Sequence, residues 1–492
     1  MEGWSIKDTA RKYVCPFCIL MAIYTIGILA IIRADFYYID DIGRTFWGYR
    51  RFQYFSRYVA EFGSILVHGD YHLTDISPIP QILAAGVMAI SGVVLLHVIT
   101  GKERFSWIEY IAMVPLCLSP YFLECMSYKF DAPYMAISVL VSVAPVLFYK
   151  NGTAKYLLSV VLGTLIMCMS YQASSGIFPM LIVLLALKKW SQRVSMKEVG
   201  RFILLSAIGY LVGVLFFAGV IMRPTIQGDY VSTSIPAIRE LPYYFAHNLK
   251  EYYYTVATDL KPEWLVLIGV LFLGFLYVFV WESKQKWYFS LPAAGVGVLV
   301  MLLLTFGMYP ALETPLFAPR AMYGFGVMVC MIGIYAVSAI GRKEYVVAKA
   351  ACLVLCWCFF AFAFTYGNTL NVQKTYTDYR IASVIDDLDE AGVFDSEETK
   401  TVQISGTIGY APGIYAMRQD YQILNRLIPV MFQNSSWEWG RFGFENYYGL
   451  PKMEWASDNK MDLQEMNLPI LKNSTYHTIR ADSGHILIEL KY

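Results

Sequence analysis

Residues 79–100 read IPQILAAGVMAISGVVLLHVIT, a run of 22 positions without Asp, Glu, Lys or Arg. A helix needs about 20 consecutive apolar residues to cross the hydrocarbon core of a bilayer. The stretch therefore predicts a transmembrane helix, and with it an integral membrane protein.

Similar apolar segments recur on both sides of this stretch. The pair at 155–170 and 176–188 is short and is broken at Tyr171–Gly176, so the sequence leaves open whether it forms one kinked span or two. Counting two, we predict about eleven transmembrane helices, near 15–32, 79–100, 105–123, 131–149, 155–170, 176–188, 201–222, 263–281, 287–309, 320–340 and 346–366.

The composition supports this class. Of 492 residues, 57% are hydrophobic and 16% are charged, with a mean hydropathy of +0.47. The formal net charge of +1 gives no reason to expect a nucleic-acid partner. The nine cysteines lie in or beside apolar segments and none follows residue 358, which excludes a disulfide-stapled external domain.

Charge distribution predicts the orientation. Lys7, Arg11 and Lys12 precede the first apolar segment, which has no cleavage site behind it and is typical of a retained signal anchor. With a cytoplasmic N-terminus, the loops placed inside carry far more Lys and Arg than Asp and Glu, as the positive-inside rule requires. We expect a multi-pass protein of the plasma or inner membrane.

Residues 1–366 are expected to form the transmembrane domain, with large extracytoplasmic loops at 33–78 and 223–262. Residues 42–60 are rich in aromatic side chains and predict a helix in the membrane interface. The tail 367–492 is more polar, with a strand-like run at 401–408 and an apparent hairpin from Tyr476 to Leu490. It predicts a small extracytoplasmic α/β domain.

The first predicted loop contains Asp40-Asp41-Ile42-Gly43-Arg44-Thr45. On a helix, Asp41 and Arg44 are three residues apart and Asp40 and Arg44 four, so either acid can meet the guanidinium. The other acid is then free to act as a general base, since a carboxylate with an unperturbed pKa near ~4 is ionised at pH 7. The plainer interpretation is a helix cap with a surface ion pair.

Few other polar side chains lie at span ends, where an ionisable group costs roughly 2.5 to 3.5 kcal/mol. On the predicted topology they all lie on the side of Asp40 and Asp41. A carboxylate, cations able to hold phosphate and aromatic walls suit glycosyl transfer from a lipid-phosphate sugar. These residues are Lys129, Asp131, Gln172, Glu313 and Arg320.

Six motifs in order across nearly the whole chain resemble the Gtr-type, glucosyltransferase II-like enzymes that modify bacterial O-antigen or wall polysaccharide. The resemblance implies a GT-C transferase with a polyprenyl-phosphate sugar donor, glucose as the expected sugar, and a polysaccharide or lipid-linked glycan acceptor. The motifs are Tyr38–Arg44, Asp75–Gln81, Tyr128–Asp131, Tyr171–Ser174, Pro319-Arg320 and Asn425–Val430.

The resemblance maps the catalytic acid to Asp40 or Asp41 without distinguishing them. From their positions we assign three cations to the donor phosphate and four further side chains to the substrate lining. The cations are Arg44, Lys129 and Arg320, and the lining residues are Tyr128, Asp131, Tyr171 and Gln172.

Two other classes stay open. A flippase or polymerase of lipid-linked glycans shares the aromatic loops and arginines but has no need of the aspartate pair. A transporter is less consistent, because the ionisable residues gather at one face and not at the midplane of the bilayer. Paired aspartates can hold Mg²⁺ or Mn²⁺, yet transfer from a monophosphate donor does not require a metal, and we expect no cofactor.

Overall fold

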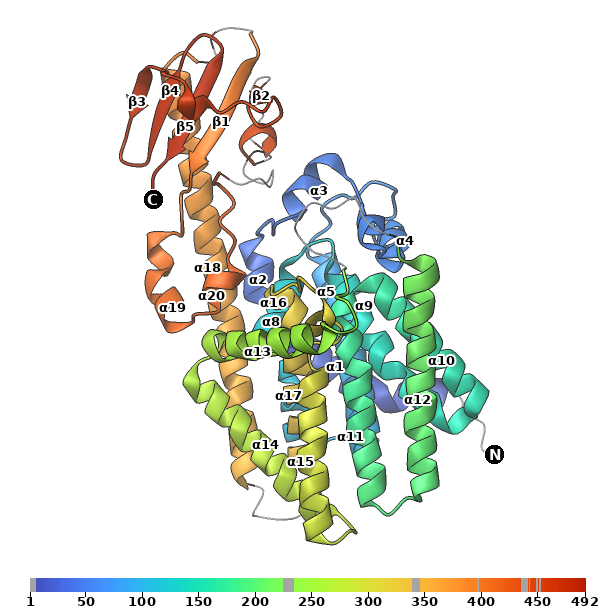
Figure 1. Cartoon of the computed structure of the whole chain (residues 1–492). Coiled ribbons are helices and arrows are strands. Elements are labelled where there is room, and N and C mark those ends of the chain that lie inside the picture. The colour runs from blue at the N-terminus through green and yellow to red at the C-terminus, as the bar shows by residue number, and fades with distance from the viewer. Residues whose placement is uncertain are drawn as a thin grey trace.

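The structure is a computed structural model that describes residues 6–223, 234–338, 346–393, 395, 398–434, 441, 443–447, 450 and 453–492. Long helices stand side by side in a bundle, and a small sheet domain lies beyond one end of it (Figure 1). The same end carries the first loop, and we call it the loop end. Residues 224–233 of the predicted second loop lie outside the described part.

Eight helices of the described part are long and apolar enough to cross a membrane, and a bent pair, Trp107–Leu118 with Pro120–Ser127, would make nine. Two further apolar helices, Lys12–Gly27 and Gly324–Val337, are shorter. The prediction of a helical membrane protein with a small C-terminal sheet is thus confirmed, whereas the count of eleven spans is not. The break after residue 170 separates two helices, Thr153–Ser170 and Ile177–Ser191.

The helices, in chain order, are α1 (Ile6–Gly27), α2 (Leu29–Ala34), α3 (Asp41–Trp47), α4 (Tyr58–His68), α5 (Ile79–Thr100), α6 (Trp107–Ile111), α7 (Val114–Leu118), α8 (Pro120–Ser127), α9 (Ala132–Val143), α10 (Thr153–Ser170), α11 (Ile177–Ser191), α12 (Met196–Phe216), α13 (Leu241–Asp259), α14 (Pro262–Glu282), α15 (Trp287–Leu304), α16 (Pro319–Met322), α17 (Gly324–Val337), α18 (Val346–Glu390), α19 (Tyr415–Asp420) and α20 (Leu424–Leu427). The strands are β1 (Lys400–Gly406), β2 (Met453–Trp455), β3 (Ile470–Asn473), β4 (His477–Ala481) and β5 (His485–Leu490).

The long helix α18 joins the bundle to the sheet domain without a linker. α18 is 45 residues long, so the predicted domain boundary at residue 366 falls inside it. Gly367 lets α18 pass close to α2, because a Cβ there would clash with the backbone carbonyl carbon of Ala30. The far end of α18 reaches into the sheet domain (Figure 1).

The C-terminal sheet has the strand order β2-β1-β5-β4-β3, with β1 parallel to β2 and to β5. β4 and β5 form the predicted hairpin, in which Ile479 lies opposite Ile488. Ile381, Val384 and Leu388 of α18 belong to the same apolar cluster as the sheet. This core fixes the sheet on the end of α18.

The first loop is not one interfacial helix, so the prediction for residues 42–60 is wrong. α3 ends at Gly48, which has a φ of +59°, and a short 3₁₀ turn, Phe52–Phe55, follows before α4. Arg51 and Ser56, on either side of this turn, also adopt left-handed conformations. The chain therefore folds back on itself and gathers its polar side chains over the bundle.

Candidate functional site

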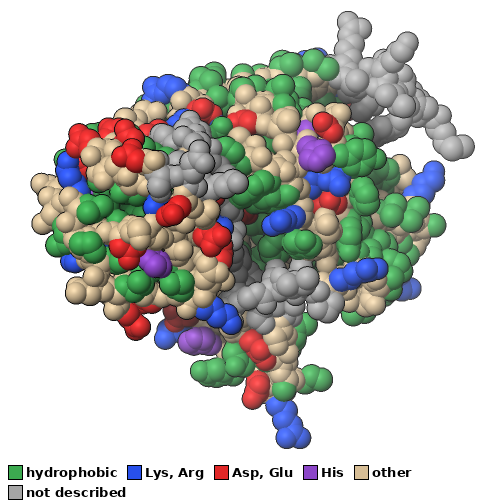
Figure 2. Space-filling view, turned by 90° about the horizontal axis from the view of Figure 1, so that it is seen from above, with side chains coloured by type: hydrophobic (Ala, Val, Ile, Leu, Met, Phe, Trp, Pro, Cys, Tyr) green, Lys and Arg blue, Asp and Glu red, His purple; other side chains and the backbone are tan. Residues whose placement is uncertain are grey.

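The predicted site residues gather at the loop end of the bundle. Seen from above, this face mixes acidic, basic and hydrophobic side chains, and it is hollowed beside the sheet domain (Figure 2). The first loop, the start of α9, the turn between α10 and α11 and the start of α16 supply the side chains described below. Segments far apart in the sequence thus meet here.

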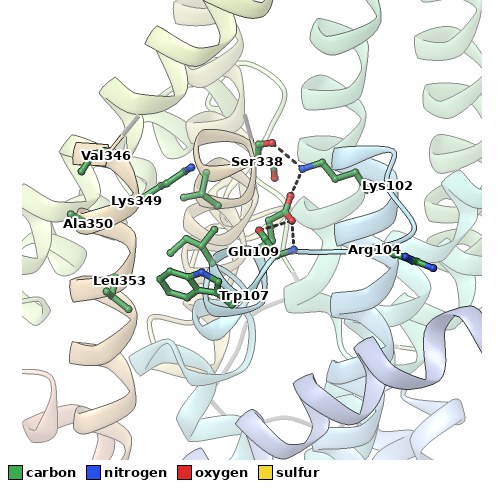
Figure 3. Close-up of a pocket in the computed structure, with 12 residues that line it drawn as sticks. Lys102, Arg104, Trp107, Glu109, Ser338, Val346, Lys349, Ala350 and Leu353 are labelled. Atoms are coloured by element: carbon green, nitrogen blue, oxygen red, sulfur yellow. Dashed lines mark hydrogen bonds and ion pairs between the residues drawn. The ribbon is translucent and has the colours of Figure 1, made fainter. Parts of the chain in front are cut away.

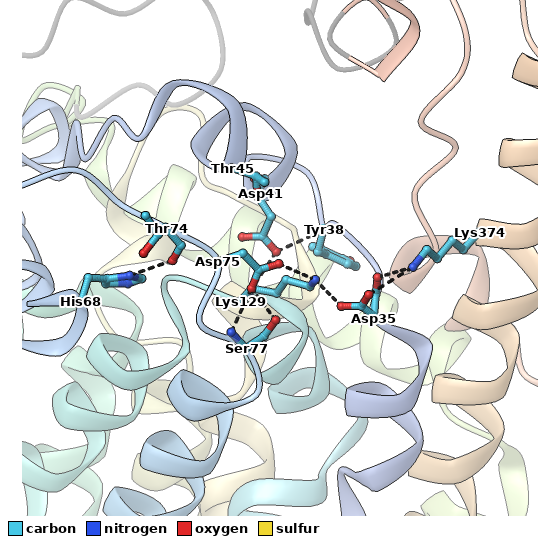
Figure 4. Close-up of polar contacts among 10 residues, drawn as sticks. All are labelled: Asp35, Tyr38, Asp41, Thr45, His68, Thr74, Asp75, Ser77, Lys129 and Lys374. Carbon is cyan, nitrogen blue, oxygen red and sulfur yellow. Dashed lines mark hydrogen bonds and ion pairs between the residues drawn. The ribbon is translucent and has the colours of Figure 1, made fainter. Parts of the chain in front are cut away.

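Asp41 is fully buried and ties two segments together. Its Oδ2 accepts the backbone N–H of Tyr38 at 3.1 Å and that of Lys129 at 2.9 Å (Figure 4). Its Oδ1 has no hydrogen-bond partner within the described residues. The carboxylate therefore fixes the start of α3 against the segment that precedes α9.

Burial raises the pKa of the Asp41 carboxyl well above its ordinary value. The backbone N–H of Lys129 lowers this pKa, as Arg44 and the N–H of Tyr38 do, but Asp131 adds to the increase. Asp41 is thus held in a place that disfavours its charged form.

We expect Asp41→Asn to raise the unfolding temperature near neutral pH. The folded-state pKa of Asp41 lies above the unfolded value, so ionisation weakens the folded state as the pH rises through the folded-state pKa. Asparagine has the same size without that charge. The gain should shrink as the pH falls toward about 4, where aspartate becomes protonated in both states. Thermal unfolding of both proteins at several pH values measures this difference, and a gap that does not change with pH would contradict it.

Asp40 differs from Asp41 in access. It is partly exposed, and as the residue before α3 it makes no capping hydrogen bond with its side chain. Its charge acts electrostatically on both Arg44 and Asp131. An incoming hydroxyl can reach Asp40, whereas Asp41 is closed off.

Arg44 does not pair with either neighbouring aspartate, so that prediction is wrong. Its Nη1 lies 3.0 Å from Oδ2 of Asp131, and the two side chains are 7% and 9% exposed. The guanidinium also stands over the ring of Phe52, 4.1 Å from its centroid. The bend of the loop turns Arg44 inward, where it meets the carboxylate of Asp131, the residue before α9. Neither of the two paired atoms completes a hydrogen bond within the described residues.

Lys129 is held between two carboxylates. Its Nζ bonds to Asp35 and lies 2.9 Å from Oδ2 of Asp75, and its side chain is only 2% exposed (Figure 4). Burial lowers the pKa of Lys129, but the bonds to both aspartates outweigh burial and leave it raised. Asp35 also meets Lys374 of α18 at 3.4 Å. Lys129 therefore links the first loop to the bundle and, through Asp35, to α18.

Arg320 pairs with Glu124, a carboxylate in the bent α8 segment. The two are joined by Nη1 and Oε1 at 2.6 Å, and Glu124 is 2% exposed. The guanidinium lies 5.7 Å from the ring centroid of Tyr128, which in turn packs edge-on against Tyr38. Arg320 is thus connected to the first loop through two aromatic rings.

Tyr171 and Gln172, between α10 and α11, contact the first loop. Arg57 donates from Nε to Oε1 of Gln172 at 3.3 Å, and its guanidinium carbon lies 4.5 Å from the ring centroid of Tyr171. Gln172 also donates to the backbone oxygen of Phe55 at 3.2 Å. The contacts described so far thus connect the predicted site residues at one end of the bundle.

Several members of this site were not among the predicted site residues. Asp35, Asp75 and Glu124 are the carboxylates that hold Lys129 and Arg320, and Arg57 contacts two predicted lining residues. Glu124 could have been identified from the sequence, because a carboxylate at the end of an apolar segment is costly unless it is paired. The pairings themselves join residues too far apart in sequence to be found by spacing.

A cavity of about 630 Å³ lies beyond the opposite end of α5, lined by the turn that follows this helix and by residues of α6, α17 and α18 (Figure 3). Glu109 is the one acidic residue among its lining residues. Its carboxylate forms an ion pair with Lys102 at 2.7 Å and accepts a hydrogen bond from the backbone N–H of Ser106 at 2.7 Å. This cavity therefore offers no free carboxylate for proton transfer, and the loop end is the better candidate. In the part of the chain that the structure describes, no group of three or more His, Cys, Asp or Glu side chains is arranged to hold a metal ion.

Helices of membrane-crossing length, with acids and cations collected over one end, define a polytopic membrane protein with a polar site at the loop end. The chain belongs to the glucosyl transferase GtrII family, whose model matches residues 29–331, more than half of the sequence. This membership implies glycosyltransferase activity, with a sugar donor and a glycan acceptor.

A relative described as an uncharacterized 55.3 kDa protein in the gtrB 5′ region of Salmonella phage P22 is 21% identical over 441 residues. The match covers 87% of this chain and 88% of the phage protein. No solved structure matches the chain significantly.

Proposed function

We propose that this protein transfers a sugar, with glucose expected, from a polyprenyl-phosphate donor to a bacterial surface polysaccharide or its lipid-linked precursor. The observation that carries the proposal is the position of Asp40. Asp40 is partly exposed, unlike Asp41 and Asp131, and its charge acts on the buried Arg44. A reachable base next to fixed positive charge suits a reaction in which a hydroxyl attacks and a phosphate leaves.

In the proposed reaction, Asp40 accepts the proton of the acceptor hydroxyl as the hydroxyl oxygen attacks the anomeric carbon. The bond between that carbon and the phosphate oxygen breaks, and its electron pair leaves with the polyprenyl monophosphate. Asp41 holds the backbone that carries Asp40 through its bond to the N–H of Lys129. A proton returned from Asp40 to water completes the cycle.

Positive charge at the loop end supports a phosphate ligand. Arg44, Lys129 and Arg320 are proposed to stabilise the leaving phosphate, with Tyr128, Asp131, Tyr171 and Gln172 lining the substrate. The polyprenyl tail of the donor would lie in the membrane beside the bundle.

We further propose that the N-terminus faces the cytoplasm and that the loop end and sheet domain face outward, in the plasma or inner membrane. The positive-inside distribution of Lys and Arg supports this orientation. No cofactor enters the proposed reaction.

The purified protein, incubated with polyprenyl-phosphate-[¹⁴C]glucose and lipid-linked glycans from the host membrane, is expected to move label into glycan. Label should not move from UDP-[¹⁴C]glucose, because the proposed donor is a polyprenyl-phosphate sugar and not a nucleotide sugar. A parallel reaction without the glycan fraction measures hydrolysis of the donor. If no polyprenyl-phosphate sugar gives up its label, the proposal falls and flipping of lipid-linked glycans should be assayed in vesicles.

A further inference from the structure

The three cations proposed for the phosphate already have carboxylate partners. Arg44 contacts Asp131, Lys129 contacts Asp35 and Asp75, and Arg320 contacts Glu124. The side chains of these three cations are between 2% and 11% exposed. An anion that bound any of them would face the paired carboxylate as well, and the two like charges would oppose each other.

Arg57 is different. It makes no ion pair with any carboxylate of the described residues, and its polar contact is the bond from Nε to the neutral amide oxygen of Gln172. Its guanidinium lies over two rings, with its central carbon 4.5 Å from the centroid of Tyr171 and 5.0 Å from that of Phe55. Arginine held in this way keeps its charge and its terminal N–H donors for a ligand.

The position of Arg57 is fixed from both sides. It is the residue before α4, and its N–H donates to the backbone oxygen of Phe52 at 3.1 Å. Gln172, which accepts from Arg57, is itself tied to the backbone oxygen of Phe55. The side chain is therefore oriented before any ligand arrives, and less entropy is lost on binding.

A second observation points to a ligand beside Arg57. The hydroxyl of Tyr171 is buried, with the residue 1% exposed, and has no hydrogen-bond partner in the described part of the chain. Buried polar atoms are usually paired, so an unpaired one needs an explanation such as a missing ligand. Arg57 also acts electrostatically on Asp131, together with Arg44 and Arg320, so it belongs to the same site.

We propose that Arg57 is the main binding residue for the phosphate of the lipid-linked substrate, and that the hydroxyl of Tyr171 donates a second hydrogen bond to it. This inference rests on the proposed function for the identity of the ligand, a phosphodiester in the donor and a phosphomonoester in the product. Gln172 orients the guanidinium. The other three cations stay paired with their carboxylates.

Direct binding tests the inference without a transfer assay. The probe is a fluorescent short-chain polyprenyl monophosphate, and the reference is the uncharged polyprenol with the same label. Wild type should bind the phosphate more tightly than the alcohol. Arg57→Gln should weaken phosphate binding by about 10-fold or more, because a charge-assisted bond is lost, and should leave alcohol binding unchanged.

Arg51→Gln is the matched control. Arg51 is also an arginine of the first loop that lies over an aromatic ring, 4.5 Å from the centroid of Tyr49. It makes no hydrogen bond or cation–π contact with Tyr171 or Gln172, so its loss should leave phosphate binding unchanged. Equal weakening by Arg51→Gln and Arg57→Gln would show that only overall charge matters and would overturn the inference.

Tyr171→Phe is a second test of the site, which stays informative if Arg57→Gln does not fold. It keeps the ring that packs against Tyr323 and removes only the unpaired hydroxyl. A weaker phosphate affinity at unchanged unfolding temperature is expected, and unchanged affinity would remove the tyrosine from the site. If wild type binds the phosphate through Arg57 but transfers no sugar, only the proposed function falls. If sugar transfer proceeds and Arg57→Gln binds phosphate normally, only this inference falls.

Discussion

Asp40→Asn is expected to lower the rate of sugar transfer by about 10²- to 10⁴-fold, the usual contribution of a general base. Asparagine keeps the size of the side chain but cannot accept the proton of the acceptor hydroxyl. Asp40 is partly exposed and makes no cap bond to α3, so the variant should unfold at the same temperature as wild type. Initial rates with a polyprenyl-phosphate sugar, together with thermal unfolding, measure both effects.

Asp41→Asn provides the comparison. The amide oxygen of asparagine can still accept the backbone N–H groups of Tyr38 and Lys129, so we expect transfer to fall by only a few-fold. Asp41→Ala leaves both buried N–H groups unpaired, at about 1–3 kcal/mol each, and should lower the unfolding temperature. The reverse pattern, with Asp40→Asn active and Asp41→Asn inactive, would make Asp41 the base.

Arg426→Ala is expected to reduce transfer strongly although it lies in the C-terminal part of the chain. Arg426 bonds to Asp259 at the end of α13 and to the backbone oxygen of Phe317, three residues before Arg320. The next residue, Leu427, accepts a hydrogen bond from the hydroxyl of Tyr38 at 2.9 Å. These two residues therefore touch both the loop that carries the aspartates and the segment that leads to Arg320.

The loss of Arg426 also leaves Asp259 buried, at 4% exposed, with the hydroxyl of Tyr121 at 3.1 Å as its remaining hydrogen-bond partner in the described part of the chain. An unpaired buried charge costs about 3–5 kcal/mol. The double variant Arg426→Ala with Asp259→Asn should recover stability but not activity, because the tie to Phe317 is still absent. Recovery of both would show that Arg426 acts on stability alone.

Asp420→Ala is the matched control for Arg426→Ala. Asp420 also joins the C-terminal part to the bundle, through Lys261 at 2.7 Å, but it is 54% exposed. An exposed pair contributes roughly 0 to 1 kcal/mol. This variant should therefore transfer sugar at nearly the wild-type rate, and a loss as large as that of Arg426→Ala would contradict a specific role for Arg426.

The sequence was sufficient for features that depend on local pattern. Apolar length predicted helices of membrane-crossing length, although not their number, and the run from Tyr476 to Leu490 predicted the hairpin that β4 and β5 form. The order of six motifs pointed to one site, and the structure collects the predicted residues at one end of the bundle.

Features that depend on distant contacts were missed. A spacing of three or four residues suggested that Arg44 meets Asp40 or Asp41. The structure instead pairs Arg44 with Asp131, 87 positions away, because the loop bends at Gly48 and buries the guanidinium. The helix predicted over residues 42–60 fails for the same reason, since left-handed residues are not visible in a hydrophobic pattern. Arg57 could not be separated from Arg51 by sequence, because its distinction is the contact with Tyr171 and Gln172, which lie 114 and 115 positions away.

Because α18 is one continuous helix, it fixes both the orientation and the height of the sheet domain relative to the bundle. One residue inserted into it would turn everything beyond by about 100° and shift it by about 1.5 Å. Such a turn would swing Arg426 and Leu427 away from their partners even though no contact residue had changed. An exchange of the sheet domain between relatives therefore has to preserve both the phase and the length of α18, because even seven added residues, close to two full turns, would shift the domain by about 10 Å.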